Sequence, residues 1–236
     1  MDGFSYYNIF ETKGLEYLII IAFLALFIPF SIILNRKVKR RKQHRQLGTV
    51  TSSVLKVPQG VYYCKNHTWT HLLKSGIASI GLDDLLLHIT GQVQINYLKS
   101  SGDPVIKGEV MTEILQDGKV LKIYSPLSGR IEETNSLITA NPELLNEDPF
   151  GTGWLFKVKP TYWKSETSDY FLAESATDWS KRELQRFKEF LAVTMPKHDP
   201  EATLFALQDG GELRDNPLAE LPGEIWLDFQ HEFMNP

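Results

Sequence analysis

Three histidines are the residues whose type most readily suggests a metal site. His67, His71 and His88 lie in one region of the chain. They lack the compact ligand spacing and the accompanying Cys or carboxylate ligands of a protein metal centre. We therefore expect isolated surface or turn histidines and no metal site.

Three carboxylates, Glu143, Glu147 and Asp148, could act as acids or bases. They stand among Asn-Pro and Asp-Pro pairs, which are turn and cap signals, so we favour structural roles. The sequence has no glycine-rich phosphate loop and no Gly-x-Ser-x-Gly nucleophile turn. Its single cysteine, Cys64, excludes an intramolecular disulfide and a multi-cysteine zinc site. We predict no catalytic residues and no enzyme activity.

Length and charge indicate the organisation that must position these residues. A chain of 236 residues has room for one central domain with appendages. Its net charge of -4 gives no global attraction to nucleic acid, so we expect no nucleic-acid partner.

The central region is predicted to be mainly β. From residue 57 to 164, short apolar runs alternate with turn signals, a pattern typical of a β-sandwich or barrel. The segment 79–91 has the spacing of a short helix ended by Gly91. Asp117-Gly118 between two apolar runs predicts a tight hairpin.

This region contains several distinctive motifs: NHTW at 66–69, SIGLDDL at 79–85, GDPVIKGE at 102–109, YSPLSG at 124–129 and the long block 141–160. Together they resemble the glycine cleavage H-protein family of the lipoyl and biotinyl domain superfamily. The resemblance covers residues 57–171 and implies a lipoyl-like hammerhead β-sandwich or barrel domain with some helix.

The resemblance implies a lipoyl-bearing lysine at the hairpin tip, and here the sequence departs from the family. Counted without gaps, the lysine position falls on Gly118, and the glutamate three residues earlier falls on Leu115. Lys119 is the nearby candidate for lipoate, but a shift of one residue turns a strand side chain to the opposite face. We favour an ordinary tight turn with a solvated lysine and expect no cofactor.

An apolar run before the central domain predicts a membrane segment. Residues 15–35 form the predicted transmembrane helix, and a Lys/Arg cluster between Arg36 and Arg45 follows it. Because basic flanks stay in the cytoplasm, we expect residues 1–14 outside and a basic linker, 36–56, inside. A cleaved signal peptide fits poorly, since the basic residues follow the apolar run. The prediction is a single-pass protein of the inner (cytoplasmic) membrane with a cytoplasmic C-terminal domain.

Residues 172–236 are predicted to be a helical extension. Ser180 and Glu183 form a capping-box pattern. Two sets of residues have amphipathic helical spacing: Leu184, Phe187, Leu191 and Met195, then Ile225, Trp226, Phe229 and Phe233. We favour packing on the central domain over binding of a partner helix.

These features lead to one main hypothesis and two alternatives. The main one is a membrane-tethered, non-lipoylated docking or scaffold subunit with protein partners. The first alternative is an active carrier with lipoate on Lys119, serving a glycine cleavage or membrane redox complex. An exporter adaptor is the weaker alternative, because its soluble part would face away from the cytoplasm.

Overall fold

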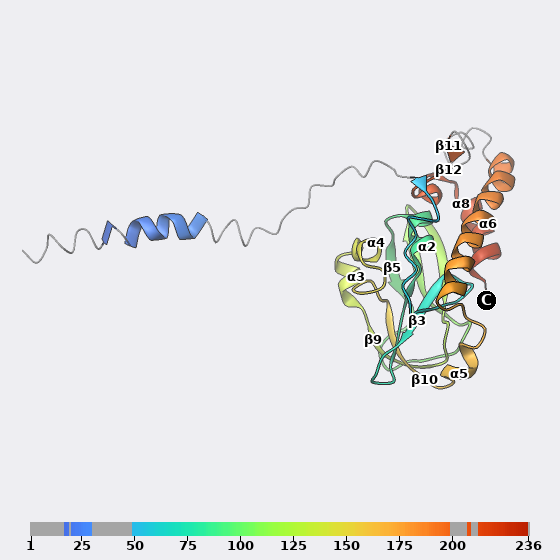
Figure 1. The fold of residues 1–236 in the computed structure, drawn as a ribbon, viewed down its shortest axis with the longest axis horizontal. Helices are drawn as coiled ribbons and strands as arrows, with labels where there is room; N and C mark the ends of the chain where they lie inside the picture. The colour runs from blue at the N-terminus through green and yellow to red at the C-terminus, as the bar shows by residue number, and fades with distance from the viewer. Residues whose placement is uncertain (1–16, 19, 30–48, 199–206, 209–211, 236) are drawn as a thin grey trace, which may run out of the picture. The chain divides into compact units, whose positions relative to one another are not determined.

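The computed structural model describes residues 17–18, 20–29, 49–198, 207–208 and 212–235 (Figure 1). By its internal contacts the chain divides into two units, Met1–Gln46 and Leu47–Pro236.

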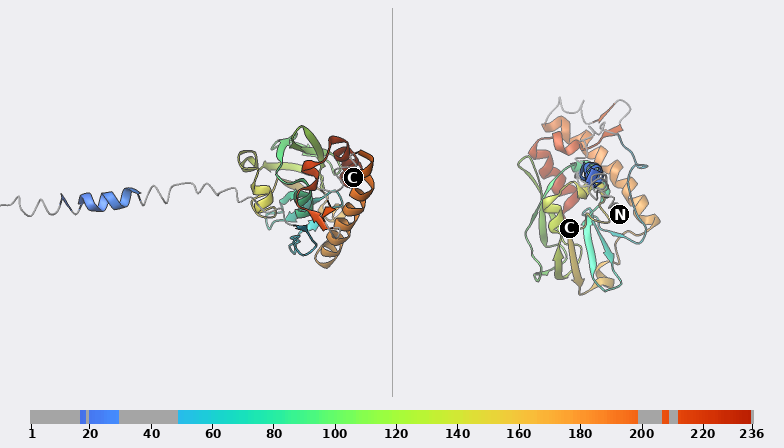
Figure 2. Two further views of the ribbon diagram at one scale, coloured as in Figure 1. Left: turned by 90° about the horizontal axis from the view of Figure 1, so that it is seen from above. Right: turned by 90° about the vertical axis from the view of Figure 1, so that its left-hand side faces the viewer.

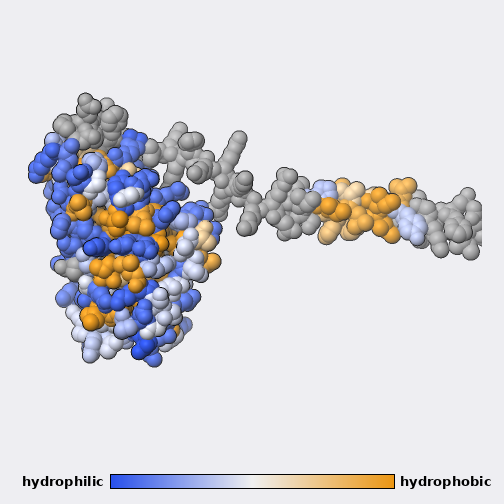
Figure 3. All heavy atoms as spheres, turned by 180° about the vertical axis from the view of Figure 1, so that it is seen from behind, coloured by the Kyte–Doolittle hydropathy of each residue, from blue (hydrophilic) through white to orange (hydrophobic). Residues whose placement is uncertain are grey.

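The described part of the first unit is helical at 17–18 and 20–29 and carries apolar side chains around the helix (Figure 3). Among the described residues, no helix combines the length and apolar character of a membrane span. This finding contradicts the predicted single-pass membrane location and the topology derived from it.

Parts of that prediction lie outside the described residues. They are the N-terminal segment 1–14, the remaining positions of the predicted helix at 15–16, 19 and 30–35, and the linker residues 36–48.

The second unit is built on β-strands in three sheets. One is a six-stranded sheet of order β2-β3-β4-β10-β9-β6, and two are three-stranded, β5-β7-β8 and β1-β12-β11. The strands are β1 (Thr49–Val50), β2 (Tyr62–Tyr63), β3 (Thr68–Leu72), β4 (Ala78–Leu82), β5 (Gln94–Tyr97), β6 (Pro104–Val105), β7 (Val110–Gln116), β8 (Lys119–Tyr124), β9 (Gly129–Thr134), β10 (Phe156–Pro160), β11 (Leu207–Gln208) and β12 (Glu212–Arg214). The predicted mainly β architecture with helices is confirmed.

Strands β7 and β8 form the predicted hairpin. Gln116 pairs with Lys119 across the turn, and the antiparallel register continues to Val110 and Tyr124. Asp117 and Gly118 have φ angles of 49° and 78°, the left-handed conformation that a two-residue hairpin turn requires. The Asp-Gly signal therefore located this turn correctly.

Helices surround the sheets. They are α2 (Asp84–Thr90), α3 (Ser136–Ala140), α4 (Leu144–Glu147), α5 (Trp163–Glu166), α6 (Glu174–His198), the 3-10 helix η1 (Pro217–Glu220), α8 (Gly223–Phe229) and the π-helix η2 (Gln230–Met234). Helix α2 confirms a short helix ended by Gly91, but residues 79–82 of the predicted segment belong to β4. The Asp83 side chain caps the helix by accepting a hydrogen bond from the Leu86 N–H at 2.7 Å.

The C-terminal helices pack on the β unit, as we favoured. Figures 1 and 2 show α6 and α8 beside the sheets, away from α3 and α4. Phe187, Leu191, Trp226 and Phe229 are buried and belong to the same apolar core as the strand residues.

The predicted capping box is wrong, because Ser180 and Glu183 lie inside α6 and are buried. The helix begins earlier, after Ala173 with its positive φ of 54°. There the Ser175 hydroxyl contacts the backbone of Leu172, accepting from its N–H and donating to its carbonyl.

Candidate functional site

The hairpin tip carries the residues that the sequence singled out, and its lysine is engaged by the chain itself. The Lys119 ammonium donates to the carbonyls of Ala219 at 2.7 Å, Leu221 at 3.2 Å and Leu218 at 3.5 Å. It also lies over the Trp226 ring, 5.1 Å from the centroid. Lys119 is therefore a half-buried, bonded cation and differs from the solvated lysine that we expected.

Burial lowers the pKa of the Lys119 ammonium, and the nearby Asp117 carboxylate opposes that change. The three carbonyls also accept hydrogen bonds, so they favour the protonated Lys119 amine, which has three N–H donors. Because all three belong to residues close to the end of η1, they supply the negative end of a helical turn to the cation.

Gly118, where the resemblance implied the family's lysine, lies at the exposed tip. A Cβ atom built there would meet nothing within 4 Å. Leu115 pairs with Val120 of β8 and is half-buried. The tip thus presents an exposed glycine where the resemblance implied an acylated amine.

The segment that binds Lys119, Glu212–Asn235, is called the C-terminal strap below. It also covers the outer edge of β8: the Gln230 side-chain amide accepts from the Lys122 N–H at 2.6 Å and donates to its carbonyl at 3.3 Å. Its buried apolar side chains are Leu213, Leu218, Leu221, Ile225, Trp226, Phe229, Phe233 and Met234. The strap is therefore part of the core of this unit.

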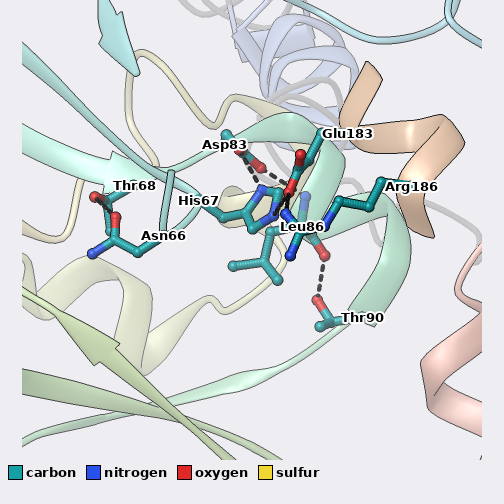
Figure 4. Close-up of polar contacts among 8 residues, drawn as sticks. All are labelled: Asn66, His67, Thr68, Asp83, Leu86, Thr90, Glu183 and Arg186. Atoms are coloured by element: carbon teal, nitrogen blue, oxygen red, sulfur yellow. Dashed lines mark hydrogen bonds and ion pairs between the residues drawn. The ribbon is translucent and has the colours of Figure 1, made fainter. Parts of the chain in front are cut away.

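A second polar cluster centres on His67, which is completely buried (Figure 4). Its Nδ1 lies 2.8 Å from Asp83 Oδ2, and its Nε2 lies 3.7 Å from Glu183 Oε1 of α6. Burial favours the neutral ring, but the two carboxylates raise the pKa of His67 above its ordinary value. Arg186 pairs with Glu183 at 2.5 Å. This network joins the β domain to α6.

The other histidines occupy different environments. His88 of α2 contacts Asp215 at 2.7 Å and Asp84 at 3.4 Å. His71 is exposed, with Nδ1 3.0 Å from the Gly60 carbonyl. The prediction of isolated surface or turn histidines holds for His71 and is wrong for His67 and His88.

Sequence reasoning missed Glu183 and Asp215 because they lie far along the chain from His67 and His88, and motif spacing carries no signal for such distant pairs. Asp84, four residues before His88 on α2, had a helical spacing that could have indicated its contact. Among the described residues, no group of His, Cys, Asp and Glu side chains is arranged to hold a metal ion.

The predicted carboxylates do not form a common acidic site with the histidines. Asp148 accepts hydrogen bonds from the backbone N–H groups of Thr152 and Gly151, and these bonds lower its pKa. Glu143 and Glu147 lie at the two ends of α4, at its N-cap and its last residue. The contacts of Asp148 fit the structural role expected for it.

Comparison with known proteins shows where this chain has relatives. The family model described as glycine cleavage H-protein matches residues 61–183. The probable glycine cleavage system H protein of Pyrococcus abyssi is 34% identical over 126 residues, covering 53% of this chain and 93% of that protein. The glycine cleavage system H protein of Streptomyces coelicolor is 35% identical over 120 residues, covering 51% and 94%.

A crystal structure of a glycine cleavage system H protein from Mycobacterium marinum is also similar. It shares 23% identity with a TM-score of 0.46, covering 52% of this chain and 98% of that one. The C-terminal strap lies wholly outside the residues that the family model matches.

Proposed function

Since this chain belongs to the glycine cleavage H-protein family, we propose that it is a non-lipoylated, non-catalytic member that acts as a docking subunit for protein partners. The observation that carries the proposal is the binding of the Lys119 ammonium by three carbonyls of the C-terminal strap.

Modification of a lysine depends first on access to its amine. A ligase that attaches lipoate must place an activated carboxyl group against a free amine on an exposed turn. The Lys119 amine is instead bonded to main-chain oxygens and lies over an aromatic ring. Attachment at Lys119 would require those bonds to break, and a neutral amide would then replace the cation.

The second support is the residue change at the tip. Gly118 occupies the family's lysine position and Leu115 occupies the position of the acidic neighbour. Both features that mark the site in the family are therefore replaced, while the hairpin itself is retained. Retention of the scaffold without its acceptor supports a binding role.

The test is the intact mass of the full chain after co-expression with a lipoate ligase and lipoate. The Streptomyces coelicolor H protein, expressed in the same way, is the positive control. We expect an unmodified mass for this chain. A lipoyl increment that fragment sequencing places on Lys119 would reject the proposal and establish the carrier alternative.

Two causes could prevent lipoylation: the binding of the Lys119 amine by the strap, and the replacement of the family residues at positions 118 and 115. A matched variant separates them. Gly118→Lys with Leu115→Glu restores the family residues; the space around position 118 is open, but its φ of 78° strains a lysine there, so thermal unfolding must first show that the variant folds. We expect this variant to gain a lipoyl group at residue 118 while Lys119 stays unmodified.

The docking half of the proposal has its own test. The tagged full chain should recover a stable protein partner from its native cells, with components of a glycine cleavage type or redox complex as the first candidates. Recovery of the chain alone under mild cross-linking would refute a docking role, whatever the lipoylation result.

A further inference from the structure

His88 lies at the junction of two elements that are distant in the sequence. It occupies the last turn of α2, and Asp215 directly follows β12. Its Nδ1 is 2.7 Å from Asp215 Oδ1, and its Nε2 is 3.4 Å from Asp84 Oδ2. Protonated His88 therefore bridges two carboxylates, whereas a neutral ring can donate to one of them.

A backbone hydrogen bond joins the same two elements beside this bridge. The Asn216 N–H donates to the His88 carbonyl at 2.8 Å. Asn216 has a φ of 62°, and its side chain lies against Gly91, where an added Cβ would come within 2.7 Å. The end of β12 is thus attached to the end of α2 at one place.

The sheet held at this place is small. Strand β12 pairs with β1 through Thr49–Arg214 and Val50–Leu213, and β11 pairs with β12 on the other side. Of the side chains described in this sheet, Val50 and Leu213 are buried. Both side chains belong to the main apolar core, and the contacts of His88 and Asn216 add a polar attachment beside them.

We infer that His88 is a charge-dependent pin: with its proton it holds the β1-β12-β11 sheet on α2 through both carboxylates, and without the proton it keeps only one of these contacts, so the sheet opens more readily. The inference rests on contacts that are independent of lipoylation and docking. If it is correct, the attachment of β1 depends on the protonation state of His88.

The charged groups around the pin are few. Asp84 faces His88 from α2 itself and also accepts the Lys56 backbone N–H at 2.8 Å. On the strap, Arg214 pairs with Glu220 of η1 at 3.7 Å. Helix α4, which contacts α2, carries Glu147.

Partial burial of His88 works against its charge, but the hydrogen bonds to Asp215 and Asp84 raise its pKa to about 9. Since the attached state has the higher pKa, the stabilisation is complete below the ordinary histidine pKa of about 6.5. It is lost as the pH rises from there through about 9. Loss of the proton also leaves the carboxylates of Asp84 and Asp215 facing a neutral ring.

The test is millisecond pulse-labelling hydrogen exchange on the full chain between pH 7 and pH 10, with rates corrected for intrinsic exchange. We expect protection of the β1 and β12 amides to fall about tenfold or more across this range. The β3–β4 ladder serves as the internal reference and should keep its protection.

Variants identify the titrating group. In His88→Gln and in Asp215→Asn, protection of β1 and β12 should be low at pH 7 and should no longer change with pH. His71→Gln, which alters an exposed histidine, should behave as the unaltered chain.

Three results would overturn the inference. They are pH-independent protection of β1 and β12 in the unaltered chain, an undiminished pH response in both His88→Gln and Asp215→Asn, and a parallel loss of protection in β3–β4. The last two would assign the effect to another group, such as the buried His67, or to the whole unit.

Discussion

Replacing Lys119 with methionine isolates the contribution of the ammonium group at the hairpin tip. Methionine keeps a flexible apolar stem beside Trp226 and removes the three N–H donors. The Leu218 carbonyl keeps another partner, because the Trp226 indole N–H donates to it at 2.8 Å. The carbonyls of Ala219 and Leu221 lose the donor at 2.7 Å and 3.2 Å.

Each buried acceptor left without a partner costs about 1–3 kcal/mol. Water can reach this half-buried site and replace part of the loss, so we expect a combined decrease of about 2 kcal/mol in the free energy of unfolding. Urea unfolding followed by tryptophan fluorescence measures the difference, with the slope on denaturant unchanged.

Lys122→Met is the matched control, because Lys122 lies on the same strand with an exposed side chain and contributes its backbone to Gln230. We expect a change within about 0.5 kcal/mol. Equal stabilities of the two variants would show that the carbonyls of the strap do not depend on the Lys119 ammonium.

Two further substitutions test the core and the buried network. Phe229→Ala should cost about 3–5 kcal/mol in thermal unfolding, because this ring is fully buried, whereas Leu227→Ala, at a side chain 60% exposed, should change stability little. Asp83→Ala removes both the helix cap and the nearest carboxylate to His67, and a loss of about 2–4 kcal/mol in urea unfolding is expected. The exposed Asp178→Ala provides its control, and similar losses in both would argue against a special role for the buried carboxylate.

Local signals in the sequence predicted the local structure well. Asp117-Gly118 located the hairpin turn because few residue pairs adopt two consecutive positive φ angles. Gly91 located the end of α2, because glycine readily adopts the positive φ found there, whereas the cap formed by Asp83 was not predicted. The family motifs then indicated the scaffold, and the family match agrees with them.

Interactions between distant residues could not be predicted in the same way. The surroundings of Lys119 depend on carbonyls contributed from the far end of the chain, and a carbonyl has no sequence signature. The partners of His67 and His88 are likewise set by tertiary packing. Hydropathy predicted the membrane span from composition alone. That prediction is wrong, because none of the helices that the structure describes is long and apolar enough to span a membrane.

The contact between Gln230 and β8 has a consequence for how copies of this chain meet one another. An outer strand with free N–H and C=O groups is a template for pairing with a strand of another molecule. At Lys122 both groups are already bonded to the Gln230 amide, and the Tyr124 carbonyl accepts from the Asn66 amide at 3.2 Å. Side-chain amides thus stand where a neighbouring strand would add at Lys122 and Tyr124, so this part of the hairpin edge is blocked to intermolecular sheet growth.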